Sequence, residues 1–313
     1  MNTEPTPSGT PTEDAGDQPP ACVLSFNVGD PSGAGGSAGD IATIAAMGAH
    51  PLPVLTGVLM RDTAEVFDQH VLEADTVVEQ ARAILEDISA AAFKVGFLGS
   101  AEVVGAVAEV LSDYPDVPVV AYLPALPWVE DDEQQAYLDA LRQLVLPAAE
   151  VLVGNHKTLA DFLLPDWDSE RAPSARELAV AAAAHGARHV LVTGIMLSSK
   201  GAQQYIDNVL ASPQGALTGE KFELFEASFV GAGDTLSAAL AALLAAGSEL
   251  HDAVGEALSF LDQSLDAGFR PGMGNVVPDR YFWALPPADE DGGDPEGGEA
   301  AAAEPKSVSR RVH

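Results

Sequence analysis

A short glycine-rich segment, Gly231-Ala232-Gly233-Asp234, directly precedes an alanine- and leucine-rich run typical of a buried helix. The first turn of a helix leaves backbone N–H groups unpaired and carries the positive end of the helix dipole, so it binds anions. A carboxylate at Asp234 is placed to accept the proton of a substrate hydroxyl during phosphoryl transfer. The segment therefore favours phosphoryl transfer to an alcohol, and the alternative is that Asp234 caps its own helix.

A second glycine-rich segment, GDPSGAGGSAGD at residues 29–40, joins the first predicted strand to the first predicted helix. Loops at the carboxyl edge of a parallel sheet are the usual ligand sites of α/β proteins. The segment lacks the G-x-x-x-x-G-K-[ST] of a phosphate-binding P-loop, and it matches the dinucleotide fingerprint poorly. We therefore expect a ligand-binding loop of another kind.

Short apolar runs alternate with longer amphipathic stretches, which is the pattern of an α/β fold with a mostly parallel sheet between two helical layers. The predicted strands are 21–28, 52–59, 91–98, 117–123, 149–154 and 188–195. The predicted helices are 36–47, 74–88, 101–112, 133–145, 157–163, 175–185, 235–246 and 250–267. Glycines 48, 186, 247 and 268 follow predicted helix ends, where a left-handed conformation is expected.

The chain has 313 residues and a formal net charge of -32, from 47 acidic and 15 basic side chains. A polyanion would repel this protein, so nucleic acid is an unfavourable partner. Most of the acidic side chains lie between the two chain ends rather than in them. The excess therefore belongs to the folded surface, and we expect a protein adapted to high salt, which screens such repulsion.

Both ends of the sequence are rich in proline, glycine and acidic residues, with little to bury. Residues 1–20 and 286–313 are therefore predicted to be disordered tails around one domain, residues 21–285. No apolar run approaches 18 residues, and no basic segment followed by an apolar one precedes the first strand. We expect no membrane span and a cytoplasmic location.

Five segments of the sequence are distinctive: GDPSGAGGSAGDIATIAAMGAHPLPVLTGV, AAFKVGFLGS, HVLVTG, SFVGAGDTLSAALAA and RPGMGNVVPDRYFW. Together they resemble the ribokinase-like kinases, and within them the hydroxymethylpyrimidine/phosphomethylpyrimidine kinases of thiamine synthesis. The resemblance covers residues 22–284. It implies a three-layer ribokinase-like domain that transfers the ATP γ-phosphoryl group to the hydroxymethyl or phosphomethyl group of an aminopyrimidine.

The resemblance also implies roles for individual residues. The backbone of Gly231, Ala232 and Gly233 would form the anion hole, and Asp234 would be the base. The acceptor would lie against Asp30, Gly33, Gly36 and Arg61. The nucleotide would lie near Asn155, Thr193 and Gly194. The implied co-substrate is ATP with Mg²⁺, a homodimer is one option, and no metal ligand is assigned.

Four positions depart from the family pattern. Asp234 stands where many pyrimidine kinases have cysteine, and sugar and pyridoxal kinases have this aspartate. Arg61 replaces a glutamine that pairs with the pyrimidine edge, and arginine only donates hydrogen bonds. Thr158 replaces a glutamate that helps to organise magnesium, and Tyr122 replaces an aspartate near the phosphates. Asp161, one turn after Thr158, is either a substitute carboxylate or an exposed helical aspartate.

Three functional hypotheses stay open at this point. The first is an ATP-dependent kinase for hydroxymethylpyrimidine, its monophosphate or both. The second is a paralogue with little catalysis that acts as a ligand-binding or regulatory protein. The third is a pyridoxal or sugar kinase of the same fold. Two further residues have two interpretations each: Lys94 either faces phosphate or extends its amine to solvent, and Asp40 is either structural or functional.

Overall fold

The computed structural model describes residues 19–197 and 204–284, and the fold below is that of the unit ending at Phe282. The predicted tails lie outside the described residues, apart from Pro19 and Pro20. No helix in the described part of the chain has both the length and the apolar character needed to cross a bilayer.

A nine-stranded sheet in the order β3-β2-β1-β4-β5-β6-β7-β8-β9 forms the middle of the unit. The six strands from β2 to β7 in this order are parallel, whereas β3, β8 and β9 pair antiparallel with their neighbours. The strands are β1 (Cys22–Gly29), β2 (His50–Arg61), β3 (Val66–Val71), β4 (Ala92–Val95), β5 (Val119–Leu123), β6 (Ala149–Asn155), β7 (His189–Met196), β8 (Tyr205–Ser212) and β9 (Gly215–Glu223).

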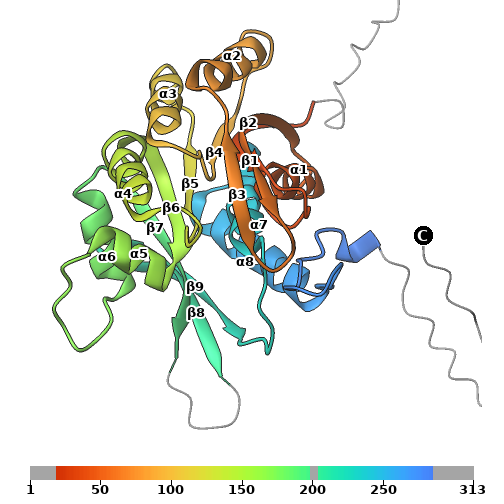
Figure 1. Ribbon diagram of the computed structural model, residues 1–313. Helices are drawn as coiled ribbons and strands as arrows, with labels where there is room; N and C mark the ends of the chain where they lie inside the picture. The colour runs from red at the N-terminus through yellow and green to blue at the C-terminus, as the bar shows by residue number, and fades with distance from the viewer. Residues whose placement is uncertain (1–18, 198–203, 285–313) are drawn as a thin grey trace, which may run out of the picture. The chain divides into compact units, whose positions relative to one another are not determined.

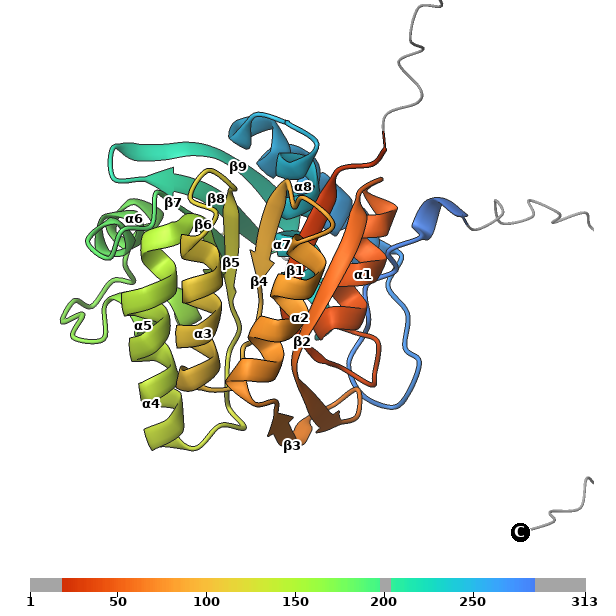
Figure 2. The same cartoon turned by 90° about the horizontal axis from the view of Figure 1, so that it is seen from above.

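Helices cover both faces of this sheet, as Figures 1 and 2 show. One layer contains α2 (Ala74–Leu85), α3 (Ala101–Ser112), α4 (Asp131–Ala140), α5 (His156–Leu163) and α6 (Ala175–Ala183). The other contains α1 (Gly36–Ala46), α7 (Ala232–Ala245) and α8 (Leu250–Asp266). Short π and 3-10 turns, η1 (Leu141–Val145) and η2 (Leu146–Ala148), continue α4, and a further 3-10 turn, η3 (Phe282–Ala284), ends the described residues.

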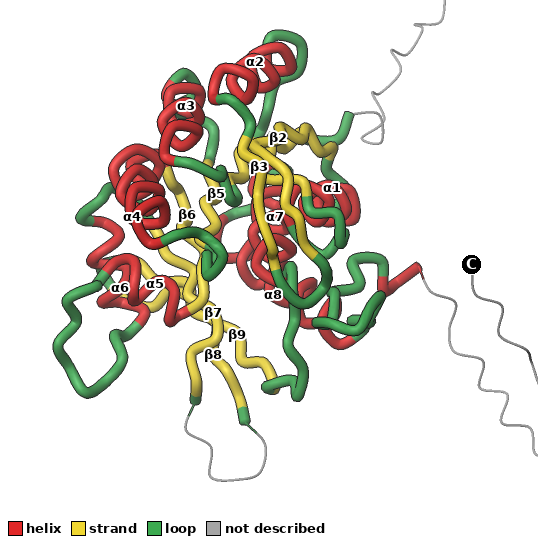
Figure 3. The backbone as a smooth tube through the Cα atoms, viewed as in Figure 1, coloured by secondary structure: helices red, strands yellow, loops and turns green. Residues whose placement is uncertain are grey.

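Alternation along the strands assigns side chains to the two layers. In β1, Leu24 and Phe26 pack toward the α2–α6 layer, while Val23 packs toward α7. Helix α7 runs behind the sheet (Figure 3). All its residues from Thr235 to Leu243 are buried, because β4, β5, α1 and α8 surround it. Its first turn is thereby fixed near the carboxyl ends of the central strands.

All six predicted strands and all eight predicted helices are present, and the mostly parallel α/β class is confirmed. Strands β3, β8 and β9 were not predicted from the sequence. Three of the four helix-end glycines, Gly48, Gly186 and Gly247, have φ between +81 and +97°. The prediction for Gly268 is wrong: its φ is not positive, and glycine is needed there because a Cβ would lie 2.8 Å from the Leu265 carbonyl oxygen.

Candidate active site

The first turns of α1 and α7, which both follow a glycine, lie against each other. The N-cap of α1 is Gly35 and that of α7 is Gly231, and neither supplies a side-chain cap. Gly231 has φ +86°, and a Cβ on it would lie 1.6 Å from the carbonyl oxygen of Ala34. Only glycine permits this approach. The two glycine-rich segments, 198 residues apart at Gly36 and Asp234, therefore meet at one site.

The carboxylate of Asp234 joins the two helix starts. Its Oδ2 accepts a hydrogen bond from the Gly36 backbone N–H at 3.0 Å. Its Oδ1 accepts from Asn27 Nδ2 at 2.9 Å and lies 2.7 Å from Lys94 Nζ. Asp234 thus caps α1 rather than its own helix, which corrects the capping alternative. The side chain keeps 16% exposure and lines a cavity, so it remains accessible to a substrate.

Behind Asp234 lies a buried charge cluster, which we define as Asn27, Asp40, Lys94 and Asp234. Lys94 Nζ is 2.8 Å from Asp40 Oδ1, and both side chains are 0% exposed. That contact is an ion pair by distance, although its angle does not satisfy hydrogen-bond geometry. Asn27 Nδ2 also donates to Asp40 Oδ2 at 3.0 Å. Both sequence-based interpretations of Lys94 are wrong, because the amine neither reaches solvent nor is free for phosphate.

The cluster separates the pKa values of its two carboxylates. Burial raises the pKa of Asp40 to about 6, although attraction to Lys94 partly opposes this rise. Burial also acts to raise the pKa of Asp234, but Lys94 and the hydrogen bonds from Gly36 and Asn27 hold it below its usual value. Burial disfavours the Lys94 ammonium, yet the two carboxylates raise its pKa overall. Asp234 is consequently ionised at neutral pH.

Asp30 organises the first glycine-rich loop. Its Oδ1 accepts from the backbone N–H and hydroxyl of Ser32, at 2.9 and 2.6 Å, and its Oδ2 accepts from the Gly35 N–H at 3.0 Å. The guanidinium of Arg61 lies 3.4 Å from Asp30 Oδ2. The loop turns through Gly33 and Gly36, whose φ values are +71 and +57°. Asp30 thus shapes the loop and fixes Arg61.

A cavity of about 310 Å³ opens between this loop, the start of α7 and the segment after β5. Four residues were predicted from the sequence to contact the phosphoryl acceptor. Asp30, Gly36 and Arg61 line this cavity, and Gly33 does not. The polar part of its wall comes from Asn27, Asp30, Arg61 and Asp234. The aromatic part comes from Phe97, Tyr122, Trp128 and Phe229. This mixture suits a small flat ring that carries a polar substituent.

Tyr122, in β5, lies against the first turn of α7. A Cβ built on Gly233 would lie 2.2 Å from the Tyr122 hydroxyl oxygen. Glycine at 233 is therefore required to admit the phenol ring. Ala232 and Gly233 are both half-buried, so the turn is not sealed.

Arg280 ties the two helix starts together from the other side. Its Nε donates to Thr235 Oγ1 at 3.1 Å, and its guanidinium also donates to the carbonyl oxygens of Gly33 and Ala34. The side chain is 5% exposed. Arg280, Asn27 and the pairing of Lys94 were not predicted from the sequence. Asn27 and Lys94 could have been noticed, because each is a polar residue inside an apolar strand run.

The three predicted nucleotide residues form a second group at the carboxyl ends of β6 and β7. Asn155 and Thr193 are register partners, and Thr193 Oγ1 donates to the Gly154 carbonyl at 3.3 Å. A Cβ on Gly194 would lie 2.8 Å from Asn155 Nδ2. Asn155 also caps α5 by accepting from the Lys157 N–H at 3.0 Å. The structure brings these three residues together, outside the lining of the 310 Å³ cavity.

No dedicated metal cage is present among the described residues, where no group of three or more His, Cys, Asp or Glu side chains converges. Thr158 and Asp161 line a neighbouring cavity of about 250 Å³. Asp161 is 66% exposed and pairs with Lys157 at 2.7 Å across one helical turn. Its exposure and its surface ion pair match the interpretation of Asp161 as an exposed helical aspartate.

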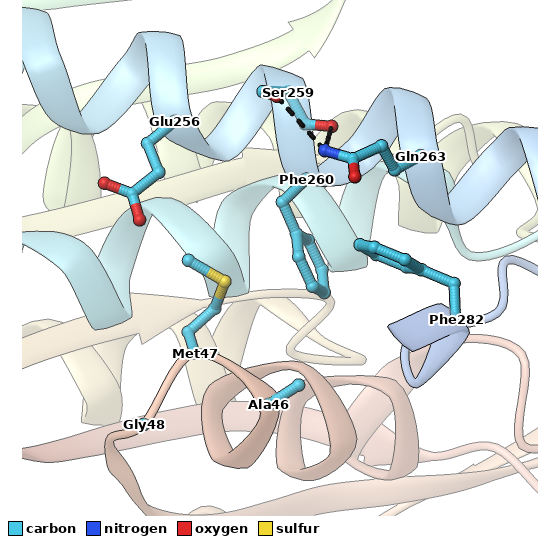
Figure 4. A pocket seen from close by; sticks show the side chains of 8 residues that line it. All are labelled: Ala46, Met47, Gly48, Glu256, Ser259, Phe260, Gln263 and Phe282. Atoms are coloured by element: carbon cyan, nitrogen blue, oxygen red, sulfur yellow. Dashed lines mark hydrogen bonds between the residues drawn. The ribbon is translucent and has the colours of Figure 1, made fainter. Parts of the chain in front are cut away.

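A third cavity, of about 410 Å³, lies between the end of α1 and α8, and Figure 4 shows its lining. The Phe260 and Phe282 rings pack together at 5.7 Å. Gln263 donates to the backbone and hydroxyl oxygens of Ser259 within α8. Glu256 is its single acidic group. This cavity brings no proton acceptor to a helix start, so the chemistry belongs to the 310 Å³ cavity.

Comparisons with known proteins agree with this geometry. A family model described as phosphomethylpyrimidine kinase matches residues 30–279. The hydroxymethylpyrimidine/phosphomethylpyrimidine kinase of Streptomyces coelicolor is 30% identical over 85% of this chain and 96% of its own. The same-named protein of Mycobacterium tuberculosis is 33% identical over 82% of this chain and 92% of its own.

Solved structures share the fold. The pyridoxal kinase of Staphylococcus aureus, in complex with AMP-PCP and pyridoxal, superposes with a TM-score of 0.72, covering 85% of this chain and 96% of that chain at 21% identity. This likeness confirms the three-layer ribokinase-like architecture. With the family match spanning both glycine-rich segments, the chain belongs to the phosphomethylpyrimidine kinase family.

Proposed function

We propose that the protein binds hydroxymethylpyrimidine or its monophosphate in the 310 Å³ cavity and phosphorylates it with ATP, in thiamine biosynthesis. The observation that carries this proposal is the meeting of Asp234, the start of α7 and the loop of residues 29–36 at one cavity wall. Membership of the family and the names of the curated relatives support the substrate class.

In the proposed reaction, the backbone N–H groups of Gly231, Ala232 and Gly233 hold the transferred phosphoryl group. Helix α7 has no side-chain cap, so the N–H groups of its first turn are available to an anion. With hydroxymethylpyrimidine as acceptor, the hydroxyl oxygen attacks the γ-phosphorus, the bond from phosphorus to the bridging oxygen of ADP breaks, and the hydroxyl proton passes to Asp234. A carboxylate of low pKa suffices as base, because the hydroxyl becomes acidic only as its bond to phosphorus forms.

The acceptor would contact the wall formed by Asp30, Gly36 and Arg61, while Gly33 shapes the loop behind this wall. Because Asp30 Oδ2 is bonded to Gly35 and Arg61, we expect Asp30 to act by placing Arg61 rather than by contacting the ring. The guanidinium only donates, which favours an acceptor with a ring nitrogen or a phosphate facing it. This preference supports the monophosphate as one of the two substrates.

ATP is proposed to extend from the start of α7 toward Asn155, Thr193 and Gly194, at the ends of β6 and β7. The described side chains do not fit a magnesium cage, since Thr158 carries no charge and Asp161 is paired at the surface. Mg²⁺ would therefore arrive with the nucleotide, held by phosphate and water oxygens, as it commonly is.

Two further predictions belong to this proposal. A cytoplasmic location stays a prediction. A homodimer also stays a prediction, and light scattering coupled to size-exclusion chromatography tests it: a dimer has twice the chain mass of 32.3 kDa.

The function is tested with purified protein, Mg-ATP and one acceptor at a time, at low and at molar KCl. The acceptors are hydroxymethylpyrimidine, its monophosphate, pyridoxal and ribose, and ADP release and the phosphorylated product are both measured. We expect turnover with one or both pyrimidines. Turnover with pyridoxal or ribose alone would reassign the substrate. No turnover, with thermal stabilisation by a pyrimidine, would support the ligand-binding paralogue instead.

A further inference from the structure

Tyr122 lies beside the turn where the transferred phosphoryl group is proposed to bind. Its ring extends from β5 to the first turn of α7, where a Cβ on Gly233 would lie 2.2 Å from the phenol oxygen. It lines the 310 Å³ cavity together with Asp234 and Gly231. The hydroxyl is therefore next to both the base and the proposed anion hole.

The Tyr122 hydroxyl has no hydrogen-bond partner within residues 19–197 and 204–284. Its oxygen is not one of the fully buried side-chain oxygens that lack a partner, and the residue lines the cavity, so the hydroxyl is open to the cavity. The fully buried Tyr137 behaves differently, since its hydroxyl accepts from the Leu98 N–H at 3.3 Å. A polar atom left open to a cavity is available to a ligand. The Tyr122 hydroxyl thus has no structural role to fill.

The charges around Tyr122 determine how the hydroxyl can act. Burial, and then the negative charge of Asp234, raise the pKa of Tyr122 above its usual value. The phenol therefore keeps its proton and donates. Lys94 Nζ lies 5.7 Å from the ring centroid, but its ammonium pairs with Asp40 and Asp234 and cannot also reach the cavity.

We propose that Tyr122 is a catalytic residue whose hydroxyl donates a hydrogen bond to an oxygen of the phosphoryl group as it is transferred. This inference rests on the proposed function and adds a side-chain donor to the backbone amides of Gly231–Gly233. During the step, the acceptor oxygen bonds to the γ-phosphorus and the bond from phosphorus to the bridging oxygen of ADP breaks. The acceptor proton moves to Asp234, and Tyr122 retains its own.

Tyr122→Phe removes only the hydroxyl and leaves the ring against Gly233. Loss of one donor to a developing charge typically lowers turnover by about 10- to 100-fold or more. We therefore expect kcat to fall at least about tenfold, the KM of the acceptor to change less than about threefold, and the melting temperature to stay the same. Tyr114→Phe is the matched control, because Tyr114 packs on Phe93 at 5.7 Å and does not line the cavity. It should keep wild-type kcat.

A binding measurement keeps this test separate from the identity of the acceptor. ADP with aluminium fluoride imitates the transferred phosphoryl group and needs no acceptor turnover. We expect Tyr122→Phe to bind this mixture at least about tenfold more weakly than wild type, with ADP alone bound equally. Equal affinity for the mixture, or a kcat within twofold of wild type, would overturn the role of Tyr122. Absence of pyrimidine turnover in the wild type, with the affinity difference intact, would instead refute only the substrate assignment.

Discussion

Lys94 is the single cation of the buried charge cluster, so its removal has a predictable effect on stability. Lys94→Met keeps the length of the side chain but leaves the Asp40 and Asp234 carboxylates without their ammonium. Removing one partner of a buried ion pair costs about 3–5 kcal/mol. Asp40, which is 0% exposed, cannot be solvated, whereas Asp234 at 16% exposure partly can. We therefore expect a loss within that range at pH 8.

The sign of the pH dependence follows from Asp40. Its folded-state pKa of about 6 already exceeds the unfolded value, and it rises further once the attraction of Lys94 is removed. A group with a raised folded-state pKa contributes stability that is present below its unfolded pKa and lost as pH rises through the folded value. Protonated Asp40 needs no cation. The loss caused by Lys94→Met should therefore be smaller at pH 5 than at pH 8.

Urea unfolding at a fixed molar KCl concentration measures both effects, because urea leaves the ionic strength unchanged. Lys157→Met is the matched control: Lys157 pairs with Asp161 on the exposed face of α5, so no measurable loss is expected. Adding Asp40→Asn to Lys94→Met should recover part of the stability, since it removes a buried unpaired charge. A loss below about 1 kcal/mol at pH 8, or an equal loss at both pH values, would refute the reasoning.

Three other predictions concern the helix starts, the acceptor and the surface. Gly231→Ala should abolish most turnover, because its Cβ would clash with the Ala34 carbonyl oxygen. Gly247→Ala, at φ +87° with no atom within 4 Å of the added Cβ, should lower stability only. Steady-state kinetics and melting curves compare the two variants. Arg61→Gln should raise the KM of the monophosphate about tenfold and that of the unphosphorylated pyrimidine far less, because one charge-assisted hydrogen bond is lost; equal changes would count against the assignment. The melting temperature should rise from dilute buffer to molar KCl, given a net charge of -32, and a flat response would contradict salt adaptation.

The parallel core could be predicted because its strands are buried on both faces and form apolar runs such as ACVLSFNV. No residue of β3 is buried, and β9 is mostly exposed. Both carry polar residues, so their sequences, VFDQHV and GALTGEKFE, show no apolar run. Strand β8 was not predicted because the adjacent polar residues Asp207 and Asn208 interrupt its apolar run. It pairs antiparallel with β9.

Only those parts of the site that lie in one short sequence segment could be predicted. Gly231 and Asp234 stand together in one segment, and their chemistry follows from a helix start. The pairing of Lys94 depends on Asp40 and Asp234, which lie far away in the sequence, and no local pattern indicates it. Burial of Arg280 likewise depends on carbonyl groups at Gly33 and Ala34, more than 240 residues away.

The most direct test of the account is the turnover of Asp234→Asn with Mg-ATP and the pyrimidine acceptor that the wild type uses. Asparagine keeps the shape of the side chain but cannot take the acceptor proton, so kcat should fall by about 10²- to 10⁴-fold. Thermal stabilisation by ADP should persist in this variant, which shows that the fold and the nucleotide site are intact. Wild-type kcat in Asp234→Asn would contradict the assignment of Asp234 as the base.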